Sequence, residues 1–120
     1  MSKDLVMQFL TALEGRDFEA AQAMFAPGAV MTFPTGATFT QVAELAAWSK
    51  GRYRKVWKSD HTFDELKNGD VTIVFCRGFL QGEHLDGSPI KDVRFIDRFE
   101  FKDGKIIEQN VWNDLSVKKA

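Results

Sequence analysis

The stretch VRFIDRFEFKDGKI, residues 93–106, decides the fold. Its side chains alternate between apolar and polar up to residue 102, which predicts a half-buried strand over 91–102. The Asp103-Gly104 pair that follows is typical of a tight turn between antiparallel strands. Two similar pairs, Asn68-Gly69 and Asp86-Gly87, flank another strand-like run. Together they predict a meander of four antiparallel strands, over residues 60–67, 70–85, 91–102 and 105–115.

The first half of the chain has helical periodicity instead. Apolar side chains at helical spacing predict a helix over 3–14, and Asp17 caps a second helix over 18–25. A short strand over 29–33 follows. A third helix, capped by Thr38 with Gln41 or by Thr40 alone, runs to about Trp57.

Helices followed by a meander indicate an α+β fold. Because long twisted strands curl, we expect three N-terminal helices packed on a strongly curved antiparallel sheet. Such an α+β barrel is cone-shaped and encloses a ligand pocket.

Size and charge narrow the class of protein. A chain of 120 residues, 44% hydrophobic and 28% charged, is typical of a single globular domain, here residues 1–120. A net charge of −1 does not favour nucleic acid or an anionic membrane as a partner. No long apolar stretch predicts a membrane span, and the lone Cys76 favours a reducing, cytoplasmic location.

One carboxylate lies on the apolar face of strand 91–102. That face carries Val93, Phe95, Asp97, Phe99 and Phe101 and must point inward. A carboxylate among aromatic rings loses hydration, so its pKa rises unless a cation compensates. Asp97 is therefore either a ligand-binding or acid/base group, or half of a structural ion pair.

Strand 70–85 allows two orientations, because one bulge reverses the phase of its side chains. With its Phe-rich face inward, Arg77, Phe79 and neighbouring polar groups enter the pocket, and Arg77 becomes the natural partner of Asp97. With the opposite face inward, His84 enters instead. The sequence leaves both orientations open.

Further candidates come from other segments. The last strand offers Gln109 and Asn113 as neutral hydrogen-bonding groups beside Val111. The expected apolar lining consists of Phe9, Phe33, Trp48, Tyr53, Phe79, Phe95 and Phe99. His61 and His84 are the only histidines and lack metal-ligand spacing, so we expect no metal and no cofactor. The basic residues Lys50, Arg52, Arg54, Lys55 and Lys58 are interpreted as the solvated end of the third helix.

Three segments resemble the nuclear transport factor 2-like (NTF2-like) superfamily. The run from Ile96 to Ile106 is similar to its penultimate hairpin, and the run from Gly15 to Ala21 to its first helix–helix joint. Asp86-Gly87-Ser88-Pro89 fits the preceding turn, and the order of elements agrees over essentially the whole chain. SnoaL-like polyketide cyclases, ketosteroid isomerases and scytalone dehydratase belong to this superfamily. The resemblance implies the cone-shaped fold and a homodimer formed through the sheet.

The resemblance also carries specific residues over. The neutral acid of ketosteroid isomerases falls on Asp97, but their tyrosine falls on Phe9 and their base on Phe33. Ketosteroid isomerase activity is therefore not expected. Polyketide cyclases pair a histidine with an aspartate, and here these positions fall on His84 and Asp97.

These patterns lead to three hypotheses of function. The first is a cofactor-independent cyclase, isomerase or dehydratase that acts on a small, apolar, oxygenated ligand. Asp97 is then the acid/base, tuned by Arg77 or His84. The second is a binding domain without catalysis. The third is a homodimeric interaction module that uses outward groups such as Ile96 and Trp112.

Overall fold

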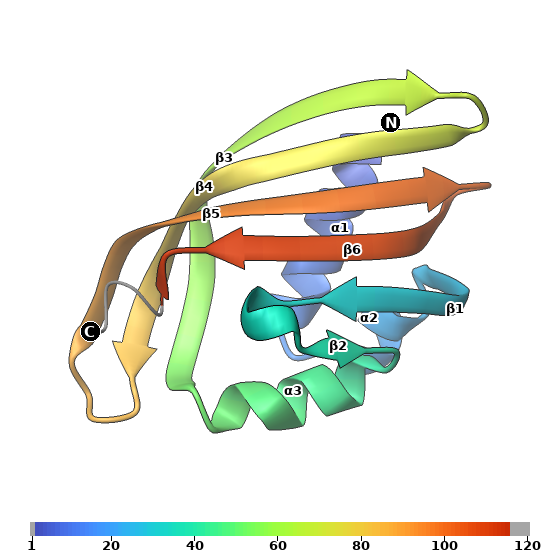
Figure 1. The fold of residues 1–120 in the computed structure, drawn as a ribbon. Coiled ribbons are helices and arrows are strands. Elements are labelled where there is room, and N and C mark those ends of the chain that lie inside the picture. The colour runs from blue at the N-terminus through green and yellow to red at the C-terminus, as the bar shows by residue number, and fades with distance from the viewer. Residues whose placement is uncertain (1, 116–120) are drawn as a thin grey trace.

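The computed structural model describes residues 2–115, which form a six-stranded sheet with helices packed against it (Figure 1). The helices are α1 (Ser2–Glu14), α2 (Phe18–Gln22) and α3 (Val42–Lys50), with a 3₁₀ turn at Pro34–Gly36. The strands are β1 (Phe25–Thr32), β2 (Thr38–Phe39), β3 (Tyr53–Asn68), β4 (Val71–His84), β5 (Pro89–Lys102) and β6 (Lys105–Asn113). The α+β class is confirmed.

The sheet has the strand order β2-β1-β6-β5-β4-β3. The predicted antiparallel meander is confirmed as β3 to β6. The sheet as a whole is mixed, however, because β1 runs parallel to β6, with Val30 opposite Glu108. It also keeps two free edges, β2 and β3, so it is an open sheet and not a closed barrel.

Two predicted helices end earlier than expected. The second stops at Gln22, and Phe25 already belongs to β1.

The third helix starts at Val42, whose backbone N–H donates to Oε1 of Gln22 at 2.7 Å, so neither predicted threonine caps it.

The third helix stops at Lys50 with Gly51 as its C-cap, and Tyr53 begins β3. Pairing of β3 with β4, from Tyr53 opposite His84 onward, outweighs the local helical periodicity.

The core lies between α1 and the inner face of the sheet, which α1 crosses in Figure 1. Phe9 of α1 is fully buried, with its ring centroid 5.2 Å from that of Phe25 and 5.8 Å from that of Phe99. Burying one such ring contributes about 2–3 kcal/mol. The inward face of β5 predicted from the alternation is confirmed, since Val93, Phe95, Asp97, Phe99 and Phe101 are all buried.

A bulge in β3 reverses the phase of its side chains. Ser59 pairs with Phe79 and Thr62 with Arg77, so β3 has one residue more than β4 over this interval. Val56 and Lys58 turn inward before the bulge, and His61 and Phe63 turn inward after it. Regular pairing would have turned Asp60 and Thr62 inward instead.

Gly78 of β4 makes room for this bulge. A Cβ atom at Gly78 would lie 2.4 Å from the carbonyl oxygen of Ser59 and 2.9 Å from that of Asp60. Since no side chain fits there, the backbone of β3 approaches β4 closely, and the long strands bend near this point (Figure 1).

The outer face of the sheet keeps some apolar side chains in solvent. Trp112 of β6 is 50% exposed and pairs across the ladder with Ile96 of β5. None of the helices within residues 2–115 has the length and hydropathy that crossing a membrane requires.

Candidate functional site

A pocket of about 310 Å³ lies between the helices and the inner face of the sheet. Such a volume suits a small organic ligand. Its apolar walls come from the three helices, from β3 and β4, and from the segment between β1 and the 3₁₀ turn. They include Leu10, Leu13, Phe18, Phe33, Val42, Leu45, Val56 and Leu80. Polar side chains interrupt these walls, namely Glu14, Arg16, Ser49, Lys50, Tyr53, Arg54, Lys55, Lys58 and Gln109.

An ion pair stands at the enclosed side of this pocket. Nζ of Lys58 lies 3.0 Å from Oδ2 of Asp97, and the Lys58 side chain is 17% exposed while that of Asp97 is 0% exposed. Lys58 lines the pocket, whereas Asp97 lies behind it, opposite Cys76 and Val111 in the ladder. Lys58 thus separates the buried carboxylate from any ligand.

The pair is poorly supported by other polar groups. Apart from Lys58, no group in the described part of the chain donates a hydrogen bond to either oxygen of Asp97. Nζ of Lys58 also lies 5.1 Å from the centroid of the Phe95 ring, within cation–π range. A ligand oxygen near Lys58 would therefore compete with few other acceptors for its protons.

Burial dominates the proton affinities of this cluster. It raises the pKa of Asp97, against the opposing charges of Lys58 and then His61. Burial acts to lower the pKa of Lys58, but the charge and hydrogen bond of Asp97, with smaller contributions from Cys76 and Tyr53, together leave that pKa raised. Burial also raises the pKa of Cys76 to about 12, so its thiol stays protonated and weakly nucleophilic. All three groups retain protons to a higher pH than usual.

Two other buried polar atoms lie in this region without a partner among residues 2–115. Gln109 lines the pocket at 1% exposure, and its Oε1 accepts no hydrogen bond. Nε2 of His61 is likewise unpaired, and its ring stacks on Phe63 and meets Phe95 edge-on. Because unpaired buried polar atoms are costly, those facing a pocket indicate a place for ligand or water.

The structure does not bring the predicted catalytic residues together. Cys76 and Leu80 of β4 are buried while Arg77 and Phe79 face outward, so the orientation with the Phe-rich face inward is wrong. The partner of Asp97 is Lys58 and not Arg77. His84 pairs with Tyr53 at the far end of β4, roughly 25 Å of strand from Cys76, and does not line the pocket.

The predicted ligand-binding residues divide into three groups. Phe33, Tyr53 and Gln109 line the pocket. Packing beside it, without lining it, are Phe9, Trp48, Phe95, Phe99 and Val111. Phe79 is 36% exposed on the outer face, and Oδ1 of Asn113 accepts a hydrogen bond from the backbone N–H of Leu115 at 3.1 Å.

Sequence reasoning missed Lys58 and Glu14. The sequence pattern places Lys58 at a solvated helix end, but in the structure it faces inward from β3. Glu14, the last residue of α1, lines the pocket, and its Oε2 accepts a hydrogen bond from the backbone N–H of Lys58 at 3.1 Å. Aromatic and β-branched residues such as Tyr53, Val56 and Trp57 are the available signal for a strand here. Across residues 2–115, no three His, Cys, Asp or Glu side chains converge as a metal site.

Comparisons with known proteins give the fold and the family. The structure of TerC co-crystallised with polyporic acid is similar at a TM-score of 0.76 and 16% identity, over 97% of this chain and 93% of that one. An NTF2-like protein of unknown function from Burkholderia pseudomallei gives a TM-score of 0.72 at 16% identity, over 97% and 92% of the two chains. A candidate polyketide cyclase from Sinorhizobium meliloti gives 0.63 at 25% identity, over 91% and 94%.

No match was found among curated proteins. The sequence profile of the SnoaL-like domain, by contrast, matches residues 6–109, which contain the pocket walls, Lys58, Asp97 and Gln109. The predicted resemblance is therefore confirmed, and the chain belongs to the SnoaL-like domain family of the NTF2-like superfamily.

Proposed function

We propose that this domain is a cofactor-independent isomerase or lyase, of the cyclase or dehydratase type, acting on a small apolar molecule with a carbonyl or hydroxyl oxygen. The observation that carries the proposal is the buried Lys58–Asp97 pair at the enclosed side of the pocket, with a 3.0 Å Nζ–Oδ2 distance. Ion pairs in low-dielectric surroundings act strongly on charge that develops next to them.

Lys58 supplies the electrophilic group in this proposal. Its ammonium lines the pocket and can donate a hydrogen bond to a substrate oxygen. Because its pKa is raised, it remains charged at neutral pH and does not act as a free amine that forms a Schiff base.

Asp97 acts through Lys58 and not on the substrate. With 0% exposure and no place in the pocket lining, it is a positioning residue that holds the ammonium and its proton in place. This assignment revises the hypothesis that Asp97 exchanges a proton directly with the ligand.

Among residues 2–115, Glu14 is the carboxylate that lines the pocket, so we assign proton abstraction to it. A proton leaves the carbon next to the carbonyl for Glu14, and the C–H electron pair forms a C=C bond. The carbonyl π electrons move to the oxygen, where Lys58 stabilises the negative charge. When a C=C bond is conjugated with the enolate, return of the proton from Glu14 to the γ-carbon gives an isomer. When the β-carbon carries a hydroxyl, the enolate re-forms the carbonyl and breaks the β C–O bond, and the departing hydroxide takes the proton from Glu14 and leaves as water.

Hydrogen–deuterium exchange at carbon tests this proposal. The probe is 2-tetralone together with its carboxylated derivatives, and the readout is loss of the α-proton NMR signals in D2O. We expect the protein to accelerate exchange, and Lys58→Met or Glu14→Gln to reduce the acceleration at least tenfold. Asp97→Asn should shift the pH profile of exchange, because it changes the environment of Lys58. Lys67→Gln, an exposed charge outside the pocket, is the matched control.

Two results would contradict the proposal. One is exchange no faster than in buffer for every probe. The other is equal rates for the Lys58, Glu14 and Lys67 variants, once circular dichroism has shown that each is folded. Binding of a probe without exchange, with affinity unchanged by Asp97→Asn, would favour the second candidate, a binding domain without catalysis. The enclosure of Asp97 behind Lys58 is the observation that favours that candidate.

The predicted homodimer stays part of the proposal. Trp112, half exposed on the outer face of β6 beside Ile96, supports it. Light scattering of the wild type and of Trp112→Glu would test it. A monomeric mass for the wild type would contradict it.

A further inference from the structure

Cationic side chains gather around the mouth of the pocket. Arg16, Lys50, Arg54 and Lys55 all line it and are largely in solvent, whereas the cation farther in is Lys58. The chain as a whole has 16 basic and 17 acidic residues and a net charge of −1. The positive charge is therefore a property of this mouth and not of the whole surface.

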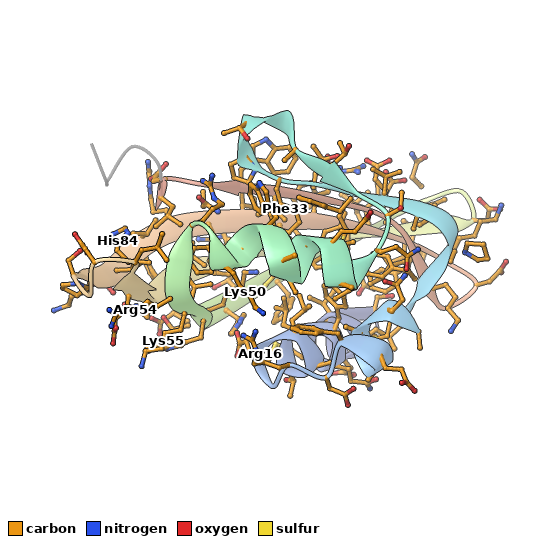
Figure 2. The ribbon with its side chains drawn as sticks, turned by 90° about the horizontal axis from the view of Figure 1, so that it is seen from below. Arg16, Phe33, Lys50, Arg54, Lys55 and His84 are labelled. Atoms are coloured by element: carbon orange, nitrogen blue, oxygen red, sulfur yellow. The ribbon has the colours of Figure 1, made fainter. Side chains whose placement is uncertain are left out.

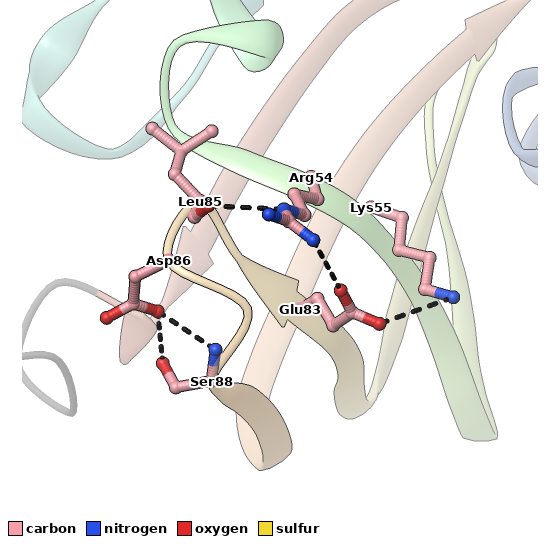
Figure 3. Close-up of polar contacts among 6 residues, drawn as sticks. All are labelled: Arg54, Lys55, Glu83, Leu85, Asp86 and Ser88. Carbon is pink, nitrogen blue, oxygen red and sulfur yellow. Dashed lines mark hydrogen bonds and ion pairs between the residues drawn. The ribbon is translucent and has the colours of Figure 1, made fainter.

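Only part of this charge is neutralised nearby. Glu83 is shared between Arg54 and Lys55, at N–O distances of 3.7 and 3.6 Å, and Nε of Arg54 donates to the backbone carbonyl of Leu85 (Figure 3). Asp97 balances Lys58. Five lining cations against Glu14, Glu83 and Asp97 leave two positive charges at the pocket.

Lys50 and Arg16 carry this excess. Within residues 2–115, neither has a carboxylate oxygen within ion-pair distance, and the Arg16 guanidinium lies over the Phe18 ring at 5.5 Å. Lys50 is the last residue of α3, and Arg16 lies in the turn between α1 and α2. Both line the pocket, and Figure 2 shows Lys50 below α3 facing Arg16 in the turn after α1, with Arg54 and Lys55 together near the start of β3.

The opposite, enclosed side of the pocket offers an acceptor. Oε1 of Gln109 is buried and receives no hydrogen bond from any group in the described chain. A ligand that fills the pocket well must donate to this oxygen, since a buried acceptor left unpaired costs binding free energy. Between the two ends the walls are apolar, including Phe33, Leu45 and Leu80.

From this distribution of charge we infer that the pocket takes an organic acid with an apolar body. Its carboxylate or acidic hydroxyl lies at the mouth between Lys50 and Arg16, and a hydroxyl at its other end donates to Gln109. The inference rests on the proposed function for the position of the reacting oxygen near Lys58, and it adds the class of substrate. The cationic mouth also attracts such an anion over distance, because the charges lie beside low-dielectric walls.

Matched aromatic probes test the inference. The charged probe is 6-hydroxy-2-naphthoate, and 6-hydroxy-2-naphthamide is its neutral counterpart of the same shape. By isothermal titration calorimetry in 20 mM salt we expect the acid to bind about tenfold more tightly than the amide. In 0.5 M NaCl this ratio should shrink to about twofold, because salt screens exposed charges.

Variants locate the effect. The double variant Lys50→Gln/Arg16→Gln should lose the preference for the acid while binding the amide as before. The control Lys67→Gln/Lys91→Gln removes two exposed charges outside the pocket and should keep the preference. Gln109→Leu should abolish the advantage of 6-hydroxy-2-naphthoate over 2-naphthoate, which lacks the hydroxyl.

Three outcomes would overturn the inference. The first is equal affinity for the acid and the amide, and the second is that neither probe binds. The third is that the preference for the acid falls equally in the pocket double variant and in the control double variant. Anion preference without proton exchange would defeat the proposed reaction and leave this inference standing. Exchange on neutral tetralones without any preference for anions would support the proposed reaction and overturn this inference.

Discussion

The inner face of the sheet has two regions that share the same strands but differ in character. One region is entirely apolar and closely packed, and its side chains are at most 3% exposed. It consists of Phe9, Phe99, Phe101 and Ile106. The other region begins at Asp97, the inward-facing position of β5 next to Phe99. There Asp97 forms an ion pair with Lys58 beside a pocket of about 310 Å³. Close packing in the aromatic region raises the free energy of unfolding, whereas the buried charges and unpaired acceptors of the polar region lower it.

Truncating one ring in each region should give the largest contrast. Phe99→Ala should lower the free energy of unfolding by about 3–5 kcal/mol, because it leaves a cavity inside close packing. Phe33→Ala, at the pocket wall, should cost about 1–2 kcal/mol, because its site is already open on one side. Urea denaturation measures both changes. Equal losses would show that the two regions are equally well packed.

Breaking the ion pair should give the next largest effect, and one that depends on pH. Lys58→Met removes the cation from Asp97, whose pKa in the folded protein is already raised by burial. The raised pKa means that folding favours the protonated acid, so stability is kept at low pH and lost as pH rises. We expect a loss of about 3 kcal/mol at pH 8 and much less at pH 5.

A double variant provides the control for this pH dependence. Lys58→Met/Asp97→Asn removes both charges, so its stability should be close to that of the wild type and nearly flat between pH 5 and 8. A Lys58→Met variant whose stability does not change with pH would show that Asp97 does not titrate in this window.

Cys76 should give a smaller effect at alkaline pH. The pKa of its thiol is about 12 in the folded protein against an ordinary value of 9.0. Its contribution to stability is therefore present below pH 9 and is lost as the pH rises toward 12. Between pH 9 and 10.5 the wild type should lose stability faster than Cys76→Ala, as followed by thermal melting. Parallel curves would contradict this expectation.

Glu83 at the rim should give the smallest change in stability. Its pairs with Arg54 and Lys55 are long and exposed, so Glu83→Gln should change the free energy of unfolding by less than about 0.5 kcal/mol (Figure 3). The same change frees two cations at the mouth. It should therefore raise affinity for 6-hydroxy-2-naphthoate about twofold without changing that for the amide. A larger stability loss would assign Glu83 a structural role.

The sequence was sufficient for the aromatic region but not for the polar one. Strict alternation on β5 correctly predicts that Asp97 and Phe99 face inward, because only backbone geometry is needed. Lys58 could not be found in this way. Its inward orientation depends on strand pairing that overrides a helical pattern, and the inward turn of His61 depends on the bulge between Ser59 and Thr62. The orientation of Arg77 stays open in the sequence for a related reason, since the phase of side chains on β4 is set by the neighbouring strands.

The close approach of the β3 backbone to Gly78 has a consequence for which substitutions the domain can accept. A single methyl group at this position would collide with the carbonyls of Ser59 and Asp60, and the bulge would have to move. A displaced bulge would rotate His61 away from Asp97 and disturb Lys58, although Gly78 itself does not line the pocket. Gly78→Ala should thus impair the site as severely as replacing one of its charged residues. Tolerance to substitution along β4 is therefore a poor guide to which residues contact the ligand.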